Sequence, residues 1–375
     1  MEQENSTAES KGKIFLISNM WPDEESPGYG SFVKNLTDGF VNNGLEIVNR
    51  ALIIGRPSLK FEKLKSYFGF FRQIIKGFSH GGFDLIYIHF PNQAIPILKF
   101  LYLFKHPKLI VNYHGEDLLY EKKGYLGFLG KMTDKFVSKN AFRIVVPSEY
   151  FKKIVDERGI IDAHKIIVSP SGGISEDIFY PSESFIPKTF SKENPMRIGY
   201  VGRLEPGKGI FSLLNAISEL TSSGFPFKAT IIGYGTLEQD VKDFVKMDKY
   251  SGNVTYIPRM PQKDLGEVYR NLDLLIFPSI AESLGLTGIE SMACGTPVIG
   301  SNARGIATYL RDGYNGFQIS PEHPSEIVEK IMKYADLTPE QKIKMRENCI
   351  STGRKYYSKH VCDELSLTLN SLIND

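Results

Sequence analysis

Short apolar runs that alternate with helical stretches are the feature that most constrains the fold of this chain. The runs have the length of buried strands, and stretches with helical spacing separate them. Such alternation predicts βαβ units, and therefore parallel sheets covered by helices. The predicted strands lie at residues 14–18, 85–90, 109–113, 143–146 and 166–168, and then at 197–201, 229–232, 254–257, 274–277 and 298–300.

The predicted strands form two groups, and residues 181–195 between them are rich in proline, serine and charge, as linkers are. A chain of 375 residues also exceeds the size at which single cores stop growing, about 250–300 residues. We therefore expect an α/β protein with two Rossmann-like, doubly wound domains that face each other across a ligand-binding cleft. The expected parts are a disordered N-terminus at 1–11, a first domain at 12–180, a linker at 181–195, a second domain at 196–355, and a C-terminal helix at 356–375 that packs on the first domain.

Composition excludes several classes of protein. The net charge of +2 does not indicate nucleic-acid binding. Three cysteines form no metal or redox pattern, seven histidines show no metal-ligand spacing, and the polar N-terminus is no signal peptide. No run reaches the roughly 18 apolar residues that could span a membrane. We expect a cytoplasmic protein without a metal ion or other cofactor.

Two glutamates, Glu282 and Glu290, lie eight positions apart in the segment 278–299. Glu282 follows the predicted strand 274–277, in the loop where ligands bind in a parallel sheet, and Glu290 lies on the helix predicted at 287–294.

The turn between the two glutamates contains Leu284, Gly285, Leu286 and Thr287. The backbone N–H groups of Gly285 to Thr287 form the N-terminus of the predicted helix, which favours an anion such as phosphate. Two carboxylates beside an anion site fit a ligand that carries both phosphates and hydroxyls, as a nucleotide sugar does.

A second glycine-containing loop follows the strand 197–201. Gly202 to Lys208 has the spacing of a P-loop, but Gly209 stands where a P-loop needs Ser or Thr for magnesium. Pro206 also removes a backbone donor from the loop. The sequence therefore disfavours a nucleotide triphosphatase.

Both segments resemble the retaining glycosyltransferases of family 4, which have the GT-B fold. In that family an Arg and a Lys after this strand bind the donor diphosphate, which implies that role for Arg203 and Lys208. Two fixed cations can stabilise the charge of a leaving diphosphate without a metal. The resemblance further implies that Glu290 holds the ribose diol and Glu282 the hydroxyls of the transferred sugar.

The resemblance extends less closely to other loops. The loop with Gly28 and Gly30 resembles the one that overhangs the donor phosphates, although Tyr29 splits the usual glycine pair. It also lacks the spacing of a dinucleotide dehydrogenase. The implied donor-binding residues are Gly28, Gly30, Gly202, Arg203, Lys208, Gly233, Arg259, Met260, Glu282, Leu284, Gly285, Leu286, Thr287 and Glu290.

Two histidines follow strands of the first domain. His114 precedes Gly115 and Asp117 and resembles the acceptor-side histidine of the family, which places it with Glu282, Arg203 and Lys208 among the catalytic candidates. A hydrogen-bonded loop histidine is the alternative. His89 lines the acceptor pocket or is a packed core histidine.

The stretch from Arg56 to Lys108 carries nine basic residues against two acidic ones, a net charge of +7. Aromatic and aliphatic residues interleave with the basic ones, as in a helix that lies on an anionic bilayer. A solvated helix face with a buried apolar side is the alternative.

The sequence therefore predicts a metal-independent, retaining glycosyltransferase. It would transfer a sugar from a nucleotide diphosphate, favoured as UDP, to a hydroxyl of a glycan or lipid-linked acceptor in cell-surface polysaccharide synthesis. The alternatives are a sugar-nucleotide epimerase, a phosphorylase, for which no pyridoxal lysine is evident, and a non-catalytic subunit with the same fold.

Overall fold

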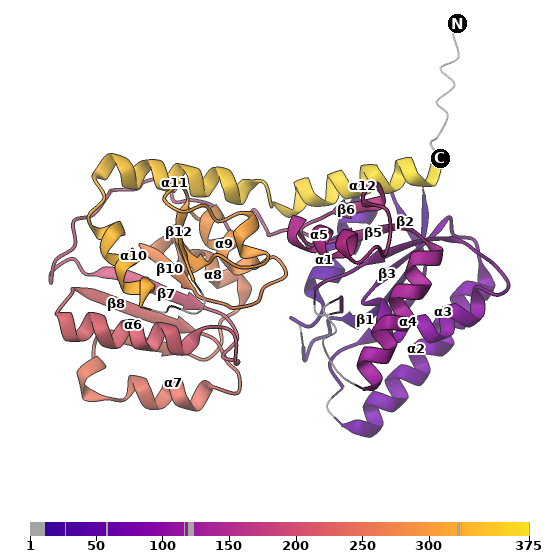
Figure 1. The fold of residues 1–375 in the computed structure, drawn as a ribbon, viewed down its shortest axis with the longest axis horizontal. Helices are drawn as coiled ribbons and strands as arrows, with labels where there is room; N and C mark the ends of the chain where they lie inside the picture. The colour runs from indigo at the N-terminus through magenta and orange to yellow at the C-terminus, as the bar shows by residue number, and fades with distance from the viewer. Residues whose placement is uncertain are drawn as a thin grey trace, which may run out of the picture. The chain divides into compact units, whose positions relative to one another are not determined.

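The computed structural model describes residues 12–26, 28–57, 59–115, 117–118, 124–320, 323 and 325–374. The chain forms two compact units (Figure 1). Unit 1 is Met1–Gly173 with Ser358–Asp375, and unit 2 is Ile174–Tyr357. The predicted disordered N-terminus, residues 1–11, lies outside the described residues. In the described part of the chain, no helix has the length and apolar character needed to cross a membrane.

Unit 1 contains a parallel six-stranded sheet in the order β2-β1-β3-β4-β5-β6. Its strands are β1 (Lys13–Trp21), β2 (Glu46–Ile54), β3 (Leu85–His89), β4 (Lys108–Asn112), β5 (Ala141–Val146) and β6 (Ile166–Val168). Its helices are α1 (Ser31–Asn42), α2 (Lys60–His80), η1 (Pro91–Gln93), α3 (Ile95–Leu101), α4 (Tyr125–Asn140), α5 (Glu149–Glu157), η2 (Ala163–Lys165) and α12 (Ser358–Asn374).

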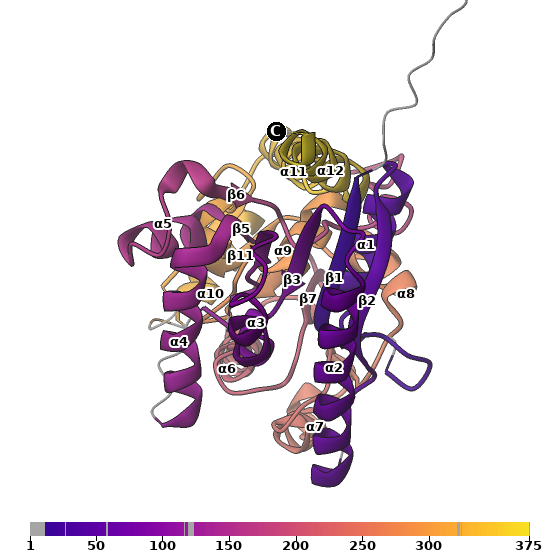
Figure 2. The ribbon, with the colours of Figure 1, turned by 90° about the vertical axis from the view of Figure 1, so that its right-hand side faces the viewer.

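Successive residues of β1 point to opposite faces of this sheet and so enter two different cores. Ile14 and Leu16 pack with residues of α1 and α12. Phe15 and Ile17 pack on the other face with residues of α2, α3, α4 and α5. On that face α2, α3 and α4 lie side by side (Figure 2). A strand that is buried on both faces must be apolar throughout, which is why these strands could be recognised in the sequence.

The C-terminal helix α12 is part of unit 1 and packs against α1. Gly39 of α1 allows the close approach, because a Cβ atom there would meet Cys362 Sγ at 2.5 Å. Lys108 Nζ donates hydrogen bonds to the carbonyl oxygens of Leu372, at 2.8 Å, and Ile373, at 3.4 Å. A cation at a helix C-terminus satisfies carbonyls that have no partner within the helix and opposes the helix dipole.

Unit 2 contains a second parallel six-stranded sheet, in the order β12-β11-β10-β7-β8-β9. Its strands are β7 (Met196–Val201), β8 (Phe227–Ile232), β9 (Val254–Ile257), β10 (Leu274–Phe277), β11 (Val298–Ser301) and β12 (Gly316–Ile319). Its helices are α6 (Ile210–Ser223), α7 (Glu238–Val245), η3 (Asp248–Tyr250), α8 (Gln262–Asn271), α9 (Leu286–Ala293), η4 (Ile306–Thr308), α10 (Glu326–Ala335) and α11 (Pro339–Arg354). Counted from β7, this is the strand order of the Rossmann fold.

The expected pair of doubly wound α/β sheets is confirmed, and all ten predicted strands are present, some with the predicted ends and the others with ends shifted by one to three residues. Two strands were not predicted, β2 and β12, and each lies at an edge of its sheet.

The chain passes from unit 1 to unit 2 between Gly173 and Ile174, earlier than the expected domain end at 180. Ile174 N already donates to Tyr356 O at 2.8 Å, inside unit 2. The segment expected as a linker, 181–195, is also attached to unit 2. Lys188 forms an ion pair with Asp273 at 3.0 Å, and Lys342 donates to Lys188 O at 2.9 Å.

Candidate functional site

The strand order of unit 2 reverses between β7 and β10, which are hydrogen-bonded neighbours. Strands β8 and β9 extend the sheet on one side, and β11 and β12 on the other. In open parallel sheets, ligands bind outside the carboxyl ends of the strands at such a reversal. Arg203 and Lys208 follow β7, and Glu282 follows β10, so the predicted residues lie beside this point.

Lys208 and Glu282 form an ion pair across the two loops. Lys208 Nζ lies 2.7 Å from Glu282 Oε1, and the side chains are 18% and 19% exposed. Ser279 Oγ donates to the same carboxylate oxygen at 2.8 Å. Lys208 Nζ also donates to Ala281 O at 3.3 Å. A partly buried pair with access to solvent can exchange partners when an anion arrives, since charge-assisted hydrogen bonds to phosphate replace those to the carboxylate.

Tyr200, a buried residue of β7, binds the loop from Gly202 to Gly209 through hydrogen bonds. Its hydroxyl donates to the carbonyl oxygens of Arg203, at 3.0 Å, and Lys208, at 3.3 Å. Arg203 itself is exposed. Sequence reasoning missed the role of Tyr200, because strand periodicity shows which face a residue takes but not its hydrogen-bond partners.

Gly209 explains why this loop is no P-loop. Its φ of +75° favours glycine, and a Cβ atom there would collide with Pro278 O. The two loops are further joined by a hydrogen bond from Ile280 N to Gly207 O at 2.9 Å. A serine or threonine that could bind magnesium does not fit at this position.

Glu290 lies on α9 and is only 7% exposed. Tyr269 Oη donates to its Oε2 at 3.0 Å, and Gln262 Nε2 donates to its Oε1 at 3.3 Å. Burial raises the pKa of Glu290 to about 7, and the two hydrogen bonds oppose this shift. Sequence reasoning missed Tyr269 and Gln262. Both belong to α8, and Gln262 is its first residue.

The helix α9 begins at Leu286, with Gly285 as its N-cap residue at a φ of +87°. Leu284 is buried, and Tyr309 Oη donates to Gly285 O at 2.9 Å. The first amides of a helix have no acceptor within it, so those at Leu286 and Thr287 can bind an anion.

The remaining residues predicted for unit 2 follow β8 and β9 on the same edge. Gly233 lies against Gly202, because a Cβ atom on Gly233 would collide with Gly202 O. The guanidinium of Arg259 lies 4.2 Å from the ring centroid of Tyr234. Met260 packs partly buried against the core. The predicted loops of unit 2 therefore form one continuous edge of its sheet.

In unit 1 the predicted residues also follow strands beside a reversal of strand order, between β1 and β3. Gly30 is the N-cap residue of α1 and has a φ of +73°, and a Cβ atom there would lie 2.7 Å from Met20 O. Gly28 is exposed, with no atom within 4 Å of such a Cβ. Gly30 is thus required by the fold of the loop, whereas Gly28 is not.

His114 follows β4, and its Nε2 lies 2.9 Å from Nδ1 of His89, the last residue of β3. The backbone N–H of His114 donates to Asp117 Oδ1, also at 2.9 Å. His89 is 1% exposed, which favours a packed core histidine over one that lines the acceptor pocket. Its hydrogen-bond partner, however, is His114, which is a catalytic candidate.

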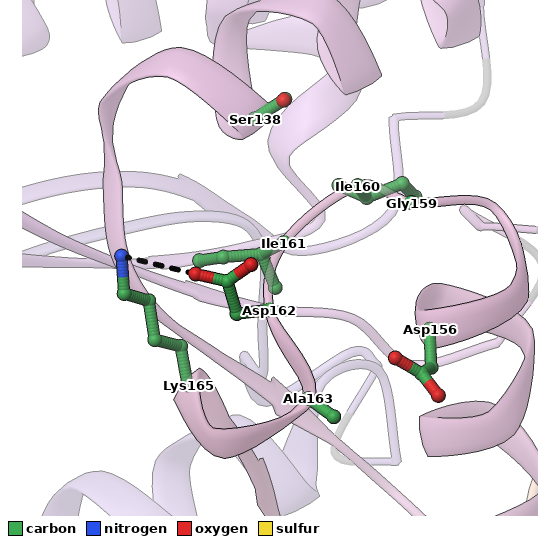
Figure 3. Close-up of a pocket in the computed structure, with 8 residues that line it drawn as sticks. All are labelled: Ser138, Asp156, Gly159, Ile160, Ile161, Asp162, Ala163 and Lys165. Atoms are coloured by element: carbon green, nitrogen blue, oxygen red, sulfur yellow. Dashed lines mark ion pairs between the residues drawn. The ribbon is translucent and has the colours of Figure 1, made fainter.

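A hollow in unit 1 lies away from these residues, just before β6 at the amino end of the strand. Lys165 and Asp162 point toward each other there, with 3.8 Å between Nζ and Oδ2 (Figure 3). None of the predicted residues lines it. The lining residues are Ser138, Asp156, Gly159, Ile160, Ile161, Asp162, Ala163 and Lys165. Within the described residues, no three His, Cys, Asp or Glu side chains gather as a metal site would require.

The helix α2, from the basic stretch of the sequence, has two separate sets of apolar residues, one buried and one exposed. Phe70, Ile74, Gly77 and Phe78 are buried against the sheet. The exposed side chains of α2 include a second apolar set, Phe61, Leu64, Phe68 and Ile75, which are 78%, 70%, 63% and 45% exposed. At 3.6 residues per turn these four fall within an arc of roughly 60°.

Lys65, Arg72 and Lys76 border this apolar stripe on one side, whereas Lys60 and Lys63 lie outside it at the start of α2. Lys60, Lys63, Lys65, Arg72 and Lys76 of α2 are all exposed. The neighbouring α3 and the turn after it expose Phe100, Leu103 and Phe104, between Lys99 and Lys105. We call these residues of α2 and 99–105 the basic-aromatic face.

Two family models match this chain. Residues 26–172 match the model described as Glycosyltransferase Family 4, and residues 181–356 match Glycosyl transferases group 1. An uncharacterized glycosyltransferase of Methanocaldococcus jannaschii is 29% identical over 67% of this chain and 65% of its own length. The capsular polysaccharide biosynthesis glycosyltransferase CapM of Staphylococcus aureus is 27% identical over 68% of each chain. The chain thus spans about two thirds of these relatives.

Solved structures agree with this assignment. A glycosyltransferase from Rickettsia africae has a TM-score of 0.73 at 18% identity, over 98% of this chain and 99% of its own. HepE from Anabaena, in complex with UDP and glucose, has a TM-score of 0.70 at 18% identity, over 96% of this chain and all of its own. The chain therefore carries a glycosyltransferase family 4 domain followed by a glycosyl transferases group 1 domain, and its two parallel sheets have the GT-B fold.

Proposed function

We propose that this protein is a retaining glycosyltransferase that moves a sugar from a nucleotide diphosphate to a hydroxyl of a glycan or lipid-linked acceptor. The observation that carries the proposal is the Lys208–Glu282 pair at the strand reversal of unit 2, beside the N-terminus of α9. A cation, a carboxylate and helix amides at one sheet edge suit a ligand with both phosphates and hydroxyls.

Unit 2 binds the donor in this proposal. Arg203 and Lys208 hold the diphosphate, together with the amides at the start of α9. Glu282, released from Lys208, accepts hydrogen bonds from the transferred sugar, and Glu290 accepts them from the ribose diol. Unit 1 binds the acceptor, with His114 at the reacting centre.

The transfer itself proceeds on one face of the sugar. The bond from the anomeric carbon to the diphosphate oxygen breaks, and its electron pair leaves with the diphosphate. The acceptor oxygen bonds to the same face of that carbon, and its proton passes to the departing diphosphate oxygen. Configuration is retained without a covalent intermediate. Arg203 and Lys208 stabilise the developing negative charge in place of a metal ion.

Similarity to two known proteins, HepE and CapM, supports the proposed classes of donor and acceptor. HepE is solved with UDP and glucose, which favours UDP among the nucleotides. CapM is named for capsular polysaccharide biosynthesis, which favours an acceptor in cell-surface polysaccharide synthesis.

A panel of radiolabelled nucleotide sugars tests this function. With a lipid-linked or glycan acceptor extract, we expect labelled product from one UDP-sugar, with activity that survives EDTA and an anomeric configuration that matches the donor. Epimerised donor without transfer would indicate an epimerase. Neither product with any donor would indicate a non-catalytic subunit. Strict dependence on magnesium or manganese would contradict the metal-independent mechanism.

We further propose that the protein is cytoplasmic and works at the inner face of the membrane, to which the basic-aromatic face attaches. Core contacts use a different side of α2, so packing within unit 1 does not account for the exposed Phe61, Leu64 and Phe68. Aromatic side chains with lysines beside them suit the headgroup region of an anionic bilayer. Each basic residue near such a surface contributes about 1 kcal/mol.

Co-sedimentation with vesicles tests the attachment. The wild type should bind vesicles that contain anionic lipid at low salt and be released at 1 M salt, where the Debye length is about 3 Å. Replacing Lys60, Lys63, Lys65, Arg72 and Lys76 by Gln should abolish binding and leave donor hydrolysis intact. Replacing five exposed lysines of unit 2 (Lys228, Lys246, Lys249, Lys344 and Lys355) by Gln is the matched control. A wild type that stays in solution would contradict the attachment.

A further inference from the structure

Unit 1 contains a pair of hydrogen-bonded imidazoles at the carboxyl edge of its sheet. His89 Nδ1 and His114 Nε2 are 2.9 Å apart, and the two rings are nearly parallel, with 17° between their planes. Strands β3 and β4 are neighbours in register, with His89 opposite Asn112. His114 lies two residues beyond the end of β4, directly after Tyr113, whose N–H donates to Val145 O of the neighbouring β5 at 2.9 Å. The ends of the two strands thus bring the two rings together.

Aromatic rings enclose His114. The ring centroid of Phe90 lies 4.4 Å from that of His114, and the ring of Phe32, on α1, lies at 4.8 Å. Burial lowers the pKa of His114 to about 3. Burial, and then the neighbouring His114, lower the pKa of His89 well below its ordinary value. Both imidazoles are therefore neutral at physiological pH.

The carboxyl group of Asp117, in the same loop, does not alter this conclusion. Asp117 Oδ1 accepts the backbone N–H groups of His114 and Gly115, at 2.9 and 2.8 Å. Burial also raises the pKa of Asp117 to about 7. The carboxyl thus orders the backbone of the loop.

Two neutral imidazoles hold two protons on four nitrogens, and one proton lies in the shared hydrogen bond. If His114 donated that proton, His89 Nε2 would carry an N–H. Yet His89 Nε2 is buried and has no hydrogen-bond partner among the residues that the structure describes. Buried N–H groups without an acceptor are rarer in proteins than acceptors that lack a donor. The arrangement in which His89 donates is therefore the less costly one.

We propose that His89 is a positioning residue that donates to His114 Nε2 and so keeps the second proton on His114 Nδ1. His114 then presents an N–H donor to an oxygen of the bound substrate, and it is no general base. The identity of that substrate rests on the proposed function. The acceptor hydroxyl must give its proton to another group, which agrees with transfer to the departing diphosphate.

The tautomer can be observed directly in the intact protein. We expect long-range proton–nitrogen correlation spectra of protein labelled with 15N-histidine to show a bare Nε2 and a protonated Nδ1 for His114. Free histidine prefers the opposite form. The variants His114→Gln and His89→Asn assign the two rings among the seven histidines. A protonated Nε2 on His114 of the wild type would overturn the proposal, whether or not any donor is transferred.

Kinetics of matched variants test the function of the pair. Asn at position 89 can donate from nearly the position of Nδ1, whereas Leu cannot. His89→Asn should keep the His114 tautomer and stay within about threefold of wild-type kcat, and His89→Leu should lose roughly tenfold, the value of one hydrogen bond. Donor KM should change in neither variant, because the donor site is in unit 2. Equal losses in Asn and Leu variants, both folded by circular dichroism, would overturn the positioning role.

Discussion

The carboxyl edges of the two sheets differ in charge although the sheets are built alike. The edge of unit 2 holds an ion pair, Lys208 with Glu282, and a buried carboxyl, Glu290. The edge of unit 1 holds two neutral imidazoles between aromatic rings. Both sets lie beside a reversal of strand order. The strand order therefore determines where each site lies, and the loop residues determine its charge and its hydrogen-bonding groups.

The difference agrees with the proposed function, in which unit 2 binds the donor and unit 1 binds the acceptor. A diphosphate is an anion and requires fixed cations, which unit 2 supplies. An acceptor hydroxyl is neutral and must stay reactive, and a neutral, apolar surrounding does not compete for its proton. The predictions below test whether the charged edge governs donor binding while the neutral edge leaves it unaffected.

Removing the cation of unit 2 should have the largest effect. Lys208→Ala leaves Glu282 with the hydroxyl of Ser279 as its side-chain partner among the described residues, and it removes a charge from the proposed diphosphate site. Breaking a buried pair costs about 3–5 kcal/mol, and solvent screening of this partly exposed pair lowers that figure. We expect transfer to fall roughly a hundredfold, and added magnesium not to restore it. Lys344→Ala, an exposed lysine of α11, is the control. Recovery with magnesium would show that a metal can replace the lysine.

The two glutamates should separate turnover from binding. Glu282→Ala should mainly lower kcat, because we propose that Glu282 binds the transferred sugar, and Glu290→Ala should mainly raise donor KM, because we propose that Glu290 binds the ribose. A charged hydrogen bond contributes about 1.5–3 kcal/mol, so losses of about ten- to a hundredfold are expected. Steady-state kinetics with varied donor distinguish the two. Unchanged kinetics in both variants would contradict the donor site.

Sequence reasoning could predict only those elements of the fold that leave a local pattern in the chain. Strands buried on both faces are continuous apolar runs, so β10 was predicted with its observed ends. The edge strand β2 is only partly buried and carries Asn49 and Arg50 in its middle, and the apolar run of β12 is interrupted by Gln318 after an initial Gly316. Neither has the pattern of a buried strand.

Side-chain pairing was beyond sequence reasoning for a different reason. Lys208 and Glu282 are 74 positions apart, Tyr269 and Glu290 are 21 apart, and His89 and His114 are 25 apart. The order of the strands in the sheet brings the members of each pair together. The residue periodicity of a single strand or helix does not reveal that order. The residues could be named from motifs, but not their partners.

The hydrogen bond from Tyr269 to Glu290 should have a smaller effect. Tyr269→Phe removes only the hydroxyl that fixes Glu290 Oε2, so the carboxyl can rotate within its site. We expect donor KM to rise severalfold, up to about tenfold, with kcat nearly unchanged. Tyr250→Phe, which removes another buried hydroxyl of unit 2, bonded to Ser218, is the control. A fall in kcat without a change in KM would place Glu290 at the reacting centre instead.

The smallest expected effect is the pH dependence of donor KM. It should follow the ionisation of Glu290 in unit 2 and not that of His114 in unit 1. Burial raises the pKa of Glu290 from 4.5 to about 7, whereas that of His114 is lowered to about 3. A donor that gives hydrogen bonds to Glu290 prefers the ionised form, so donor KM should fall as pH rises through about 7. Glu290→Gln should remove this dependence, and His114→Gln should leave it unchanged.

Stability should show the opposite sign. The folded protein holds a proton on Glu290 up to about pH 7 that the unfolded chain releases near 4.5. The free energy of unfolding should therefore fall as pH rises across that interval, because the unfolded state binds fewer protons. Asp117 of unit 1 contributes in the same sense, since burial raises its pKa to about 7 as well. Glu290→Gln should thus remove part of the slope in denaturant titrations and all of the slope in donor KM. A donor KM whose pH dependence follows His114 would reverse the roles of the two edges.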